Sequence, residues 1–439
     1  MTKILATVGP VSSDKNLKYL LDRCDMVRLN MSHNSIDWHD KNINKIKKIN
    51  SDKYVLVDIP GAKPRTLNTS SVRVKKGQKV IFAHNNKGNK IIPISNPLPK
   101  LSNKKLKTFS ISDGSFIFKF ISLKNKRLVG ISLQDFILLP KKGLNIPYSI
   151  YDDNFQSKIY KKFIKKISSI KFDCIGLSFV QNSKIIKTLK KQNKSKIFIS
   201  KIENYLGYMN RKEIINESDA IMIDRGDLAA EIGNEKLTEF SSNIIEDCKK
   251  NGKPIIIATE NLNSLITNLS PSKSDILNLD YYLSKKVDYV MLSDETATSN
   301  NWKNTLTWLK NYLILKTKKN VSINSIDMSE IIKSLSNYVI VVFSKKGFVY
   351  KNFSSNNYLN LILFTENKIL SKIANLKDNV DSFFLKFPKT NIDKFLYKNI
   401  KHQKKLIFKN SNKALLFNVT FPRKNSRANT LIILSKKDF

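Results

Sequence analysis

Short apolar runs alternate with longer stretches of helical period over the first 315 residues of the chain. This alternation is typical of βα units that build a parallel sheet. Eight runs have the character of strands, and they are Ile4–Thr7, Met26–Leu29, Tyr54–Asp58, Cys174–Leu177, Ile197–Ser200, Ala220–Ile223, Pro254–Ala258 and Tyr289–Leu292. Eight strands with helical segments after most of them predict an α/β fold, a (β/α)8 TIM barrel whose chemistry lies at the C-terminal strand ends.

Two stretches depart from this alternation. From about residue 67 to 139, short β-like runs such as Lys79–His84 and Phe116–Ile121 are separated by Asn, Gly and Pro. This predicts a small β-barrel inserted after the third strand, where it would act as a lid. A fresh set of β-like runs predicts a C-terminal α/β domain, namely Tyr338–Phe343, Leu359–Phe364, Ala414–Val419 and Leu431–Leu434. We therefore expect a catalytic barrel over 1–66 and 140–317, a lid over 67–139 and a third domain over 318–439.

Length and cysteine usage agree with this division. A chain of 439 residues is too long for one ordinary core. The sequence has no signal-peptide pattern and no apolar run of membrane-spanning length, so we expect a cytoplasmic protein that does not associate with membranes. The 3 cysteines are scattered without paired spacing, which argues against a disulfide scaffold or a zinc site.

The formal charge of +41 raises the question of nucleic-acid binding. The lysines are spread along every segment, however, which is the pattern of a solvated surface. No zinc-finger spacing, helix-turn-helix pattern or RNP-like aromatic motif accompanies them. Nucleic-acid binding therefore stays a runner-up to an enzymatic function.

Polar side chains gather where the predicted barrel strands end, in the segments Arg28–His33, Lys201–Asn204, Arg225–Leu228, Ala258–Thr259 and Ser293–Ala297. In type and order they resemble the pyruvate kinase family. Further family-like signatures are Ala6–Pro10, Ser112–Gly114, Lys142–Pro147 and Ser178–Val180. The resemblance covers roughly residues 1 to 300. It implies phosphoryl transfer from phosphoenolpyruvate to ADP, the last step of glycolysis, with Mg2+ or Mn2+ as cofactor and a homo-oligomer, which is a tetramer in the family.

The residue types suit that chemistry, which needs a divalent metal and cations around the transferred phosphoryl group. Glu203 and Asp227 offer carboxylate ligands for Mg2+ or Mn2+ at neighbouring strand ends. Lys201 lies two residues before Glu203, so both side chains face the same side of the strand. Taken alone, this pattern is equally that of a buried Lys–carboxylate pair without chemistry.

The resemblance implies roles for further residues. Arg28 would clamp phosphate as a planar, multi-donor group, which lysine cannot reproduce. Gly226, Asp227 and Thr259 would hold the substrate carboxylate, with Thr259 also near the path that delivers a proton to the enolate. As lone residues, Gly226 is more often a tight turn and Thr259 a helix N-cap. The positions that would approach ADP are Thr7, Asn30, His33, Arg65 and Lys142.

The segment after Asp58 departs from most of the family. Potassium-dependent members have glutamate where Lys63 stands, whereas a lysine there resembles the potassium-independent subfamily. An ammonium on a short tether can supply the single positive charge of a bound K+. We therefore expect independence from added K+, although the matching K+ ligand positions are retained as Asn30, Ser32 and Asp58.

Other departures bear on activity. Asp224 stands where the family usually has alanine, and Asp294 replaces a glycine. Glu260 and Asn261 replace a Gln-Met pair after Thr259. Extra carboxylates near a phosphate site repel an anionic ligand unless a metal or lysine offsets them. The alternative to an active enzyme is therefore a non-catalytic or substrate-altered homolog that binds phosphoenolpyruvate-like ligands.

Overall fold

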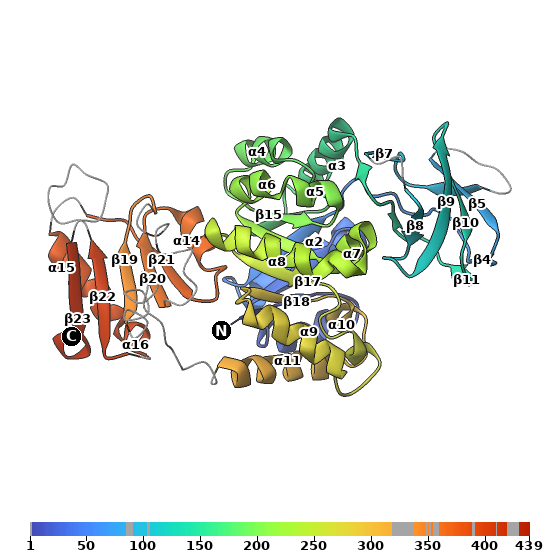
Figure 1. Ribbon diagram of the computed structural model, residues 1–439. Coiled ribbons are helices and arrows are strands. Elements are labelled where there is room, and N and C mark those ends of the chain that lie inside the picture. Colours follow the sequence, from blue (N-terminus) through green and yellow to red (C-terminus); the bar gives the residue numbers. More distant parts are fainter. Residues whose placement is uncertain are drawn as a thin grey trace.

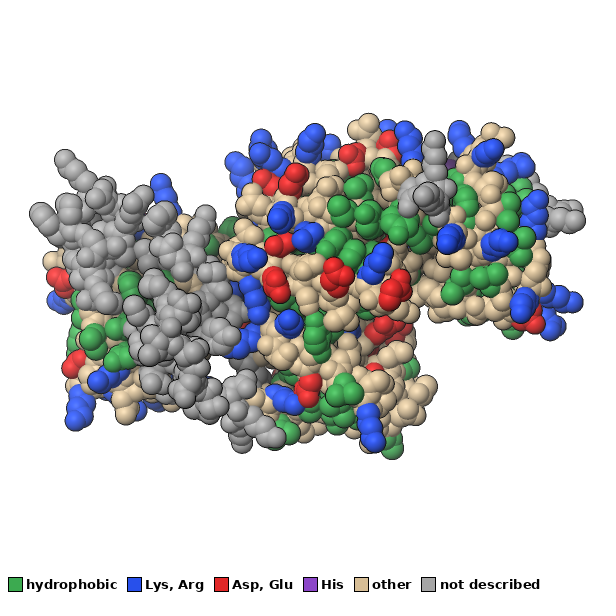
Figure 2. Space-filling view, viewed as in Figure 1, with side chains coloured by type: hydrophobic (Ala, Val, Ile, Leu, Met, Phe, Trp, Pro, Cys, Tyr) green, Lys and Arg blue, Asp and Glu red, His purple; other side chains and the backbone are tan. Residues whose placement is uncertain are grey.

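The computed structural model describes residues 2–84, 91–102, 106–317, 338–347, 350, 353, 360–388, 391–409, 411–418 and 430–439. Figure 1 shows a central barrel with a β-rich lid at one side and an α/β domain at the other. On the face drawn in Figure 2, Lys and Arg side chains are dispersed over the barrel and the lid. Within the described ranges, no helix is both long and apolar enough to cross a bilayer.

The predicted eight-stranded barrel is confirmed. Its strands pair in parallel and close in the order β1-β18-β17-β16-β15-β14-β3-β2. Their bounds are β1 Lys3–Thr7, β2 Met26–Asn30, β3 Tyr54–Ile59, β14 Cys174–Leu177, β15 Ile197–Ile202, β16 Ala220–Asp224, β17 Ile255–Ala258 and β18 Tyr289–Leu292. Most strand residues are buried, because one face fills the barrel and the other is covered by helices.

Helices surround the barrel, and several begin with a side-chain cap. Asp152 caps α3 by accepting from the Phe155 amide at 2.7 Å, and Ser272 caps α9 by accepting from the Asp275 amide at 3.1 Å. The α-helices are α1 Leu17–Leu21, α2 Ile36–Ile49, α3 Asp153–Lys166, α4 Ser183–Gln192, α5 Tyr205–Met209, α6 Arg211–Glu217, α7 Arg225–Ile232, α8 Asn234–Lys250, α9 Lys273–Ser284, α10 Asp294–Ala297 and α11 Trp302–Thr317. Two 3-10 helices join them, η1 Asp14–Asn16 and η2 Asn263–Ile266.

The lid is built from short strands around stacked phenylalanines. Phe109 stacks on Phe118 with ring centroids 5.0 Å apart, and both meet Phe82 edge to face. Six strands form one sheet in the order β12-β8-β9-β10-β5-β6, so β12 and β6 are its edges within the described ranges. The strands within 67–139 are β4 Val72–Val74, β5 Lys79–His84, β6 Ile91–Ile94, β7 Lys100–Leu101, β8 Thr108–Ile111, β9 Phe116–Lys124, β10 Arg127–Ser132 and β11 Phe136–Leu138. Two short strands follow residue 139 and pair with them, β12 Leu144–Asn145 with β8 and β13 Ser149–Ile150 with β7.

The C-terminal domain is a five-stranded sheet in the order β21-β20-β19-β22-β23, in which β23 alone runs antiparallel. The strands are β19 Val339–Phe343, β20 Asn360–Thr365, β21 Val380–Phe384, β22 Lys413–Asn418 and β23 Thr430–Ser435. The helices are α14 Lys368–Ala374, α15 Ile392–His402, α16 Lys404–Ile407 and η4 Lys436–Asp438. The expected start of this domain, over 318–337, lies outside the described residues, as do the ends of two predicted runs at 359 and 419.

This domain packs against the N-terminal end of the barrel. Leu376 follows α14 and joins the apolar cluster inside the barrel floor. Lys3 of β1 donates to the Asn375 carbonyl at 2.5 Å and to the Lys377 carbonyl at 2.7 Å. Figure 1 shows α14 on the barrel side of its sheet. The floor is thus closed by the third domain, which leaves the opposite end for a site.

Candidate active site

A pocket of about 750 Å³ lies at the C-terminal strand ends, under the lid. Barrel residues and lid residues line it together. The lid contributes Ser95, Asn96, Ser112, Asp113 and Ser115. Since the wall is shared, movement of the lid relative to the barrel would open or close the pocket.

Strand alternation aims the charged side chains into this pocket. The inward apolar layer of the barrel includes Leu5, Met26, Leu56, Ile199 and Met222. Two residues later on the same strands, and therefore on the same face, stand Thr7, Arg28, Asp58, Lys201 and Asp224. The polar layer directly follows the apolar one, and closure of the barrel brings these residues from distant parts of the sequence together.

Lys201 is at the centre of the charged layer and is 4% exposed. Its Nζ lies 2.5 Å from Glu203 Oε1, 3.2 Å from Asp224 Oδ2 and 3.3 Å from Asp58 Oδ2. Burial alone would lower the pKa of Lys201, but these carboxylates raise it above its ordinary value. The ammonium therefore stays charged throughout the physiological pH range.

Arg28 is held in a fixed orientation by two neighbours. Its Nε donates to Asp58 Oδ2 at 2.8 Å, and its Nη1 donates to Thr7 Oγ1 at 3.1 Å. Burial opposes the ionisation of Asp58, yet Lys201 and Arg28 together lower the pKa of that carboxyl. Thr7 and Asp58 thus orient the guanidinium, which still lines the pocket.

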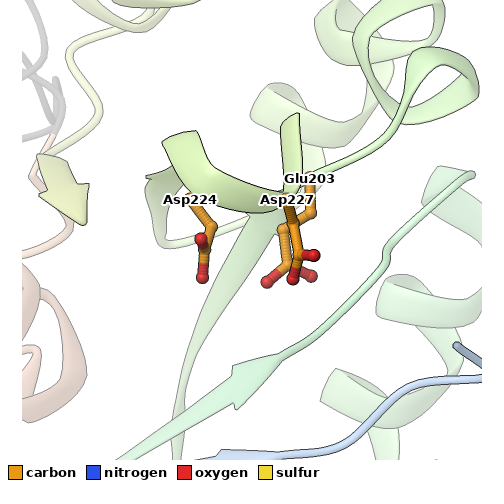
Figure 3. A group of neighbouring side chains, drawn as sticks. All are labelled: Glu203, Asp224 and Asp227. Carbon is orange, nitrogen blue, oxygen red and sulfur yellow. The ribbon is translucent and has the colours of Figure 1, made fainter. Parts of the chain in front are cut away.

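Three carboxylates converge beside Lys201. One oxygen from each of Glu203, Asp224 and Asp227 lies within 4.8 Å of the others, and Figure 3 shows all three side chains extending from the ribbon into the same space. The Oε1 atom of Glu203 is ion-paired with Lys201 but accepts no hydrogen bond. Carboxylate oxygens are the ligands that Mg2+ and Mn2+ prefer, so this group fits a divalent metal.

Lys63 lies apart from the residues with which the sequence grouped it. Its Nζ pairs with Asp227 of α7 and, at 3.0 Å, with Asp113 of the lid. A Cβ added to Gly143 would lie 2.7 Å from this nitrogen, so the absence of a side chain there leaves room for the ammonium. Within the described part of the chain, the Lys63 ammonium thus contacts Asp113, Asp227 and, with its centroid at 5.5 Å, the Phe179 ring, and not the predicted partners Asn30, Ser32 and Asp58.

Thr259 and Gly226 form the next part of the wall. The Gly226 amide donates to Thr259 Oγ1 at 2.9 Å, so this N–H already has a partner within the protein. The Thr259 hydroxyl lies 3.2 Å from Asp224 Oδ1. Thr259 has a φ of 62°, a left-handed conformation that is rare for a β-branched residue and that marks local strain at the site.

The five predicted nucleotide residues do not all line the pocket, and Thr7 is 4% exposed and accepts from Arg28. Asn30, His33 and Arg65 line the pocket, as does Ser32. Burial, with Arg65 and Arg28 nearby, lowers the pKa of His33, which therefore stays neutral at pH 7. Lys142 lies at the hinge instead, where its amide donates to Thr66 Oγ1 at 3.1 Å and its carbonyl accepts from the Thr66 amide at 2.9 Å.

Sequence reasoning gave no role to three residues that contact the charged layer. Asn145 donates to Asp227 Oδ1 at 2.9 Å, Lys201 donates to Ser178 Oγ at 3.3 Å, and Asp113 reaches Lys63 from the lid. All three stand in segments that the sequence marked as family-like. The signal for Asp113 is its turn, in which Ser112, Asp113 and Gly114 all have positive φ.

Known proteins resemble this chain over the barrel. A family model described as the barrel domain of pyruvate kinase matches residues 1–306. A pyruvate kinase from Thermococcus litoralis is 32% identical over 311 residues, which cover 67% of this chain and 65% of that protein. One from Thermotoga maritima is 30% identical over 317 residues, covering 68% and 67%. The chain thus spans slightly less than two thirds of the Thermococcus protein.

A solved structure of a pyruvate kinase from Cryptosporidium parvum shares the fold. Its TM-score is 0.78 at 23% sequence identity, and the match covers 99% of this chain and 96% of that one. The family model alone accounts for more than half of the sequence and coincides with the barrel that carries the pocket. The chain therefore belongs to the pyruvate kinase family.

Proposed function

We propose that the chain transfers the phosphoryl group of phosphoenolpyruvate to ADP, giving pyruvate and ATP as in the last step of glycolysis. The observation that carries this proposal is the convergence of Lys201 and Arg28 with Glu203 and Asp227 in one pocket under the lid. Phosphoryl transfer depends on cations around the equatorial oxygens and on a divalent metal; Lys201 and Arg28 are such cations, and Glu203 and Asp227 offer carboxylate ligands for the metal.

The metal would be Mg2+ or Mn2+, held by Glu203 and Asp227. Glu203 is buried just after β15, Asp227 is partly buried in the first turn of α7, and both carboxylates lie in one cluster. Asn145 donates to Asp227 and so fixes the orientation of that ligand. When bound, such an ion neutralises charge on the substrate oxygens.

Lys201 and Arg28 would act on the phosphoryl group. Asp58 and Thr7 hold the guanidinium in place, so little rotamer entropy is lost when phosphate binds. Lys201 stays charged because of its carboxylate neighbours, and its ammonium would stabilise the negative charge of the group in transfer. Neither residue has to titrate during the reaction.

The remaining wall would orient the two substrates. Gly226, Asp227 and Thr259 stand where the substrate carboxylate would bind, and the Thr259 hydroxyl would lie near the enolate carbon that receives a proton. For ADP, we propose contacts from Thr7, Asn30, His33, Arg65 and Lys142. The lid would exclude water from the transferred group, which limits hydrolysis.

We further propose that turnover needs no added K+. The Lys63 ammonium is 5% exposed and lies against Asp227, where it supplies a permanent single charge.

The domain limits, with a barrel over 1–66 and 140–317, a lid over 67–139 and a third domain over 318–439, remain proposals. A homo-oligomer also remains one.

Pyruvate formation from phosphoenolpyruvate and ADP tests the proposal. We expect turnover with Mg2+ or Mn2+, with no need for K+, and its loss when the metal is chelated. The competing function, a homolog that binds without catalysis, predicts thermal stabilisation by phosphoenolpyruvate with no pyruvate formed. Extra acidic residues at the pocket wall, Asp224, Glu260 and Asp294, are the observation that keeps this second candidate.

A further inference from the structure

Asp224 is the last residue of β16 and the residue from which α7 begins. An aspartate at such a position usually caps the helix, yet the Asp224 side chain makes no capping hydrogen bond. It points instead into the barrel on the same face as Ala220 and Met222, and it is 6% exposed. The Asp224 carboxylate therefore does not act as a helix cap, and its orientation into the barrel needs another explanation.

We propose that Asp224 is a third carboxylate ligand of the divalent cation, beside Glu203 and Asp227. This inference rests on the proposed function, because it concerns the metal used there. One oxygen from each of the three residues lies within 4.8 Å of the others, which is a span that one cation can bridge after small side-chain rotations. Figure 3 shows the Asp224 carboxylate beside the other two.

The charge of the pocket supports a cation site. The whole chain carries 77 Lys and Arg against 36 Asp and Glu. Among the residues that line the pocket this ratio is reversed. The acids are Asp113, Glu203, Asp224, Asp227, Glu260, Asp294 and Glu295, and the bases are Arg28, Lys63, Arg65, Lys162 and Lys201. Two unbalanced negative charges in a strongly basic protein favour the entry of one divalent ion.

The ammonium groups already present leave oxygens for that ion. Lys201 is shared by three carboxylates, so Asp58 can satisfy it when Glu203 and Asp224 turn toward a metal. Glu203, which is 1% exposed, has one oxygen that accepts no hydrogen bond at all. That oxygen, Oε1, is ion-paired with Lys201 Nζ at 2.5 Å, so it becomes available to a metal when Asp58 holds the ammonium instead.

A role as a mere partner of Lys201 explains less. Asp58 and Glu203 already provide that ammonium with two negative neighbours, so a third buried carboxylate adds repulsion between acids. A hydrogen bond to Thr259 at 3.2 Å offsets only part of that cost. A divalent ion offsets it directly, because its two charges act on all three carboxylates at once.

A third carboxylate has a measurable consequence for the free protein. A third carboxylate adds a negative charge to the site and so strengthens metal binding before substrate arrives. We therefore expect Mn2+ to bind the full-length protein in the absence of phosphoenolpyruvate and ADP. The measurement is isothermal titration calorimetry with MnCl2 and no substrate.

Asp224→Asn tests the ligand itself, because it keeps the shape and removes the charge. We expect the Kd for Mn2+ to rise at least about tenfold, since even residues that only support a ligand change metal affinity by that factor. Asp294→Asn is the matched control, because it removes one negative charge from the same pocket but outside the cluster. Equal Kd values for the two variants would overturn the proposal.

A second measurement uses the wild-type protein alone and does not depend on the folding of a variant. A six-coordinate Mn2+ with three protein oxygens keeps about three water ligands, and with two protein oxygens it keeps about four. Electron spin-echo measurements in 17O-enriched water count these ligands. About three waters supports Asp224 as a ligand and about four contradicts it, and neither result depends on whether phosphoenolpyruvate is turned over.

Discussion

Lys63, which is buried, and Asp227, which is partly buried, form an ion pair that joins the loop after β3 to the first turn of α7. Burial would raise the pKa of Asp227, but the Lys63 ammonium and the Asn145 amide lower it to about 2. The same ammonium lies 3.0 Å from Asp113 of the lid. One side chain therefore connects a proposed metal ligand with the domain that covers the pocket.

Lys63→Met should make activity depend on K+. The substitution keeps the length of the side chain but removes the charge that Asp227 and Asp113 share. We expect kcat/KM without K+ to fall at least about tenfold, which is equivalent to about 1.4 kcal/mol in the barrier, and added K+ to restore part of it. The assay is pyruvate formation at fixed ionic strength, with K+ exchanged for tetramethylammonium.

Lys162→Met is the control for that variant. Lys162 also lines the pocket, but its side chain is exposed and its removal leaves the Lys63 pairs intact. It should show no new response to K+. If Lys63→Met also stays fully active without K+, the internal cation is not Lys63.

Gly143→Ala should also make activity depend on K+, because it should displace the Lys63 ammonium from its position beside Asp227. The new Cβ would lie 2.6 Å from Lys63 Cε and 2.7 Å from Nζ, which is closer than real contacts allow. The end of a lysine is flexible, so the ammonium should move away from Asp227 and leave the fold intact. We expect a K+ response in the same direction as that of Lys63→Met; an activity without K+ equal to that of the wild type would contradict this.

Asn261→Ala should destabilise the barrel. Asn261 is fully buried, donates to the carbonyls of Ile257 at 3.2 Å and Met291 at 2.8 Å, and accepts from Arg225 at 2.9 Å. The substitution leaves a buried guanidinium and two carbonyls with fewer partners. We expect a loss of about 2–4 kcal/mol in the free energy of unfolding, measured by urea denaturation.

The control for this loss is Asn44→Ala on the exposed face of α2, which should change the free energy of unfolding by less than about 0.5 kcal/mol. A similarly small change for Asn261→Ala would show that the hydrogen bonds of Asn261 are not needed for stability.

The contact between the barrel and the third domain should depend on pH. Burial and the neighbouring Asp288 raise the pKa of Asp378 from 3.8 to about 6, with Lys3 and Lys377 as the facing cations. An acid whose pKa is higher in the folded than in the unfolded protein makes its full favourable contribution to the free energy of unfolding at low pH, where it is protonated in both of these states. This contribution is lost as the pH rises from about 4 through about 6.

Asp378→Asn should therefore be more stable than the wild type at pH 7.5 and as stable as the wild type near pH 4. The gain in the free energy of unfolding at pH 7.5 should be at most about 2 kcal/mol, because the side chain is only partly buried. Urea denaturation at both pH values measures the difference. The control, Asp393→Asn, changes an exposed acid of α15 and should show no such pH dependence. A constant difference between wild type and Asp378→Asn would contradict the assignment.

Much of the barrel and its charged layer could be predicted from the sequence, because both follow from local rules. Because side chains alternate between the two faces of a strand, the sequence alone predicts that Lys201 and Asp224 face into the barrel. Closure of eight βα units then brings the strand ends to one face. Strand positions agreed to within one or two residues for this reason.

Contacts that depend on how the domains meet could not be predicted. Lys63 was grouped with Asn30, Ser32 and Asp58 by resemblance, but its ammonium lies against Asp227 and Asp113. The position of the Lys63 ammonium depends on the open space at Gly143 and on the lid turn formed by residues 112–114. Neither feature leaves a periodic signal in the sequence. The engagement of the Gly226 amide by Thr259 likewise depends on the left-handed backbone at residue 259.

The most direct test of phosphoryl transfer at this site is pyruvate formation by Lys201→Met beside the wild type, with Mg2+, phosphoenolpyruvate and ADP. The ammonium faces Glu203, Asp224 and Asp58, and it is the charge that would act on the transferred group. We expect wild-type turnover and a fall of at least about 100-fold in the variant, with its fold retained by circular dichroism. Turnover by the variant at the wild-type rate, or none by the well-folded wild type, would contradict the proposed function.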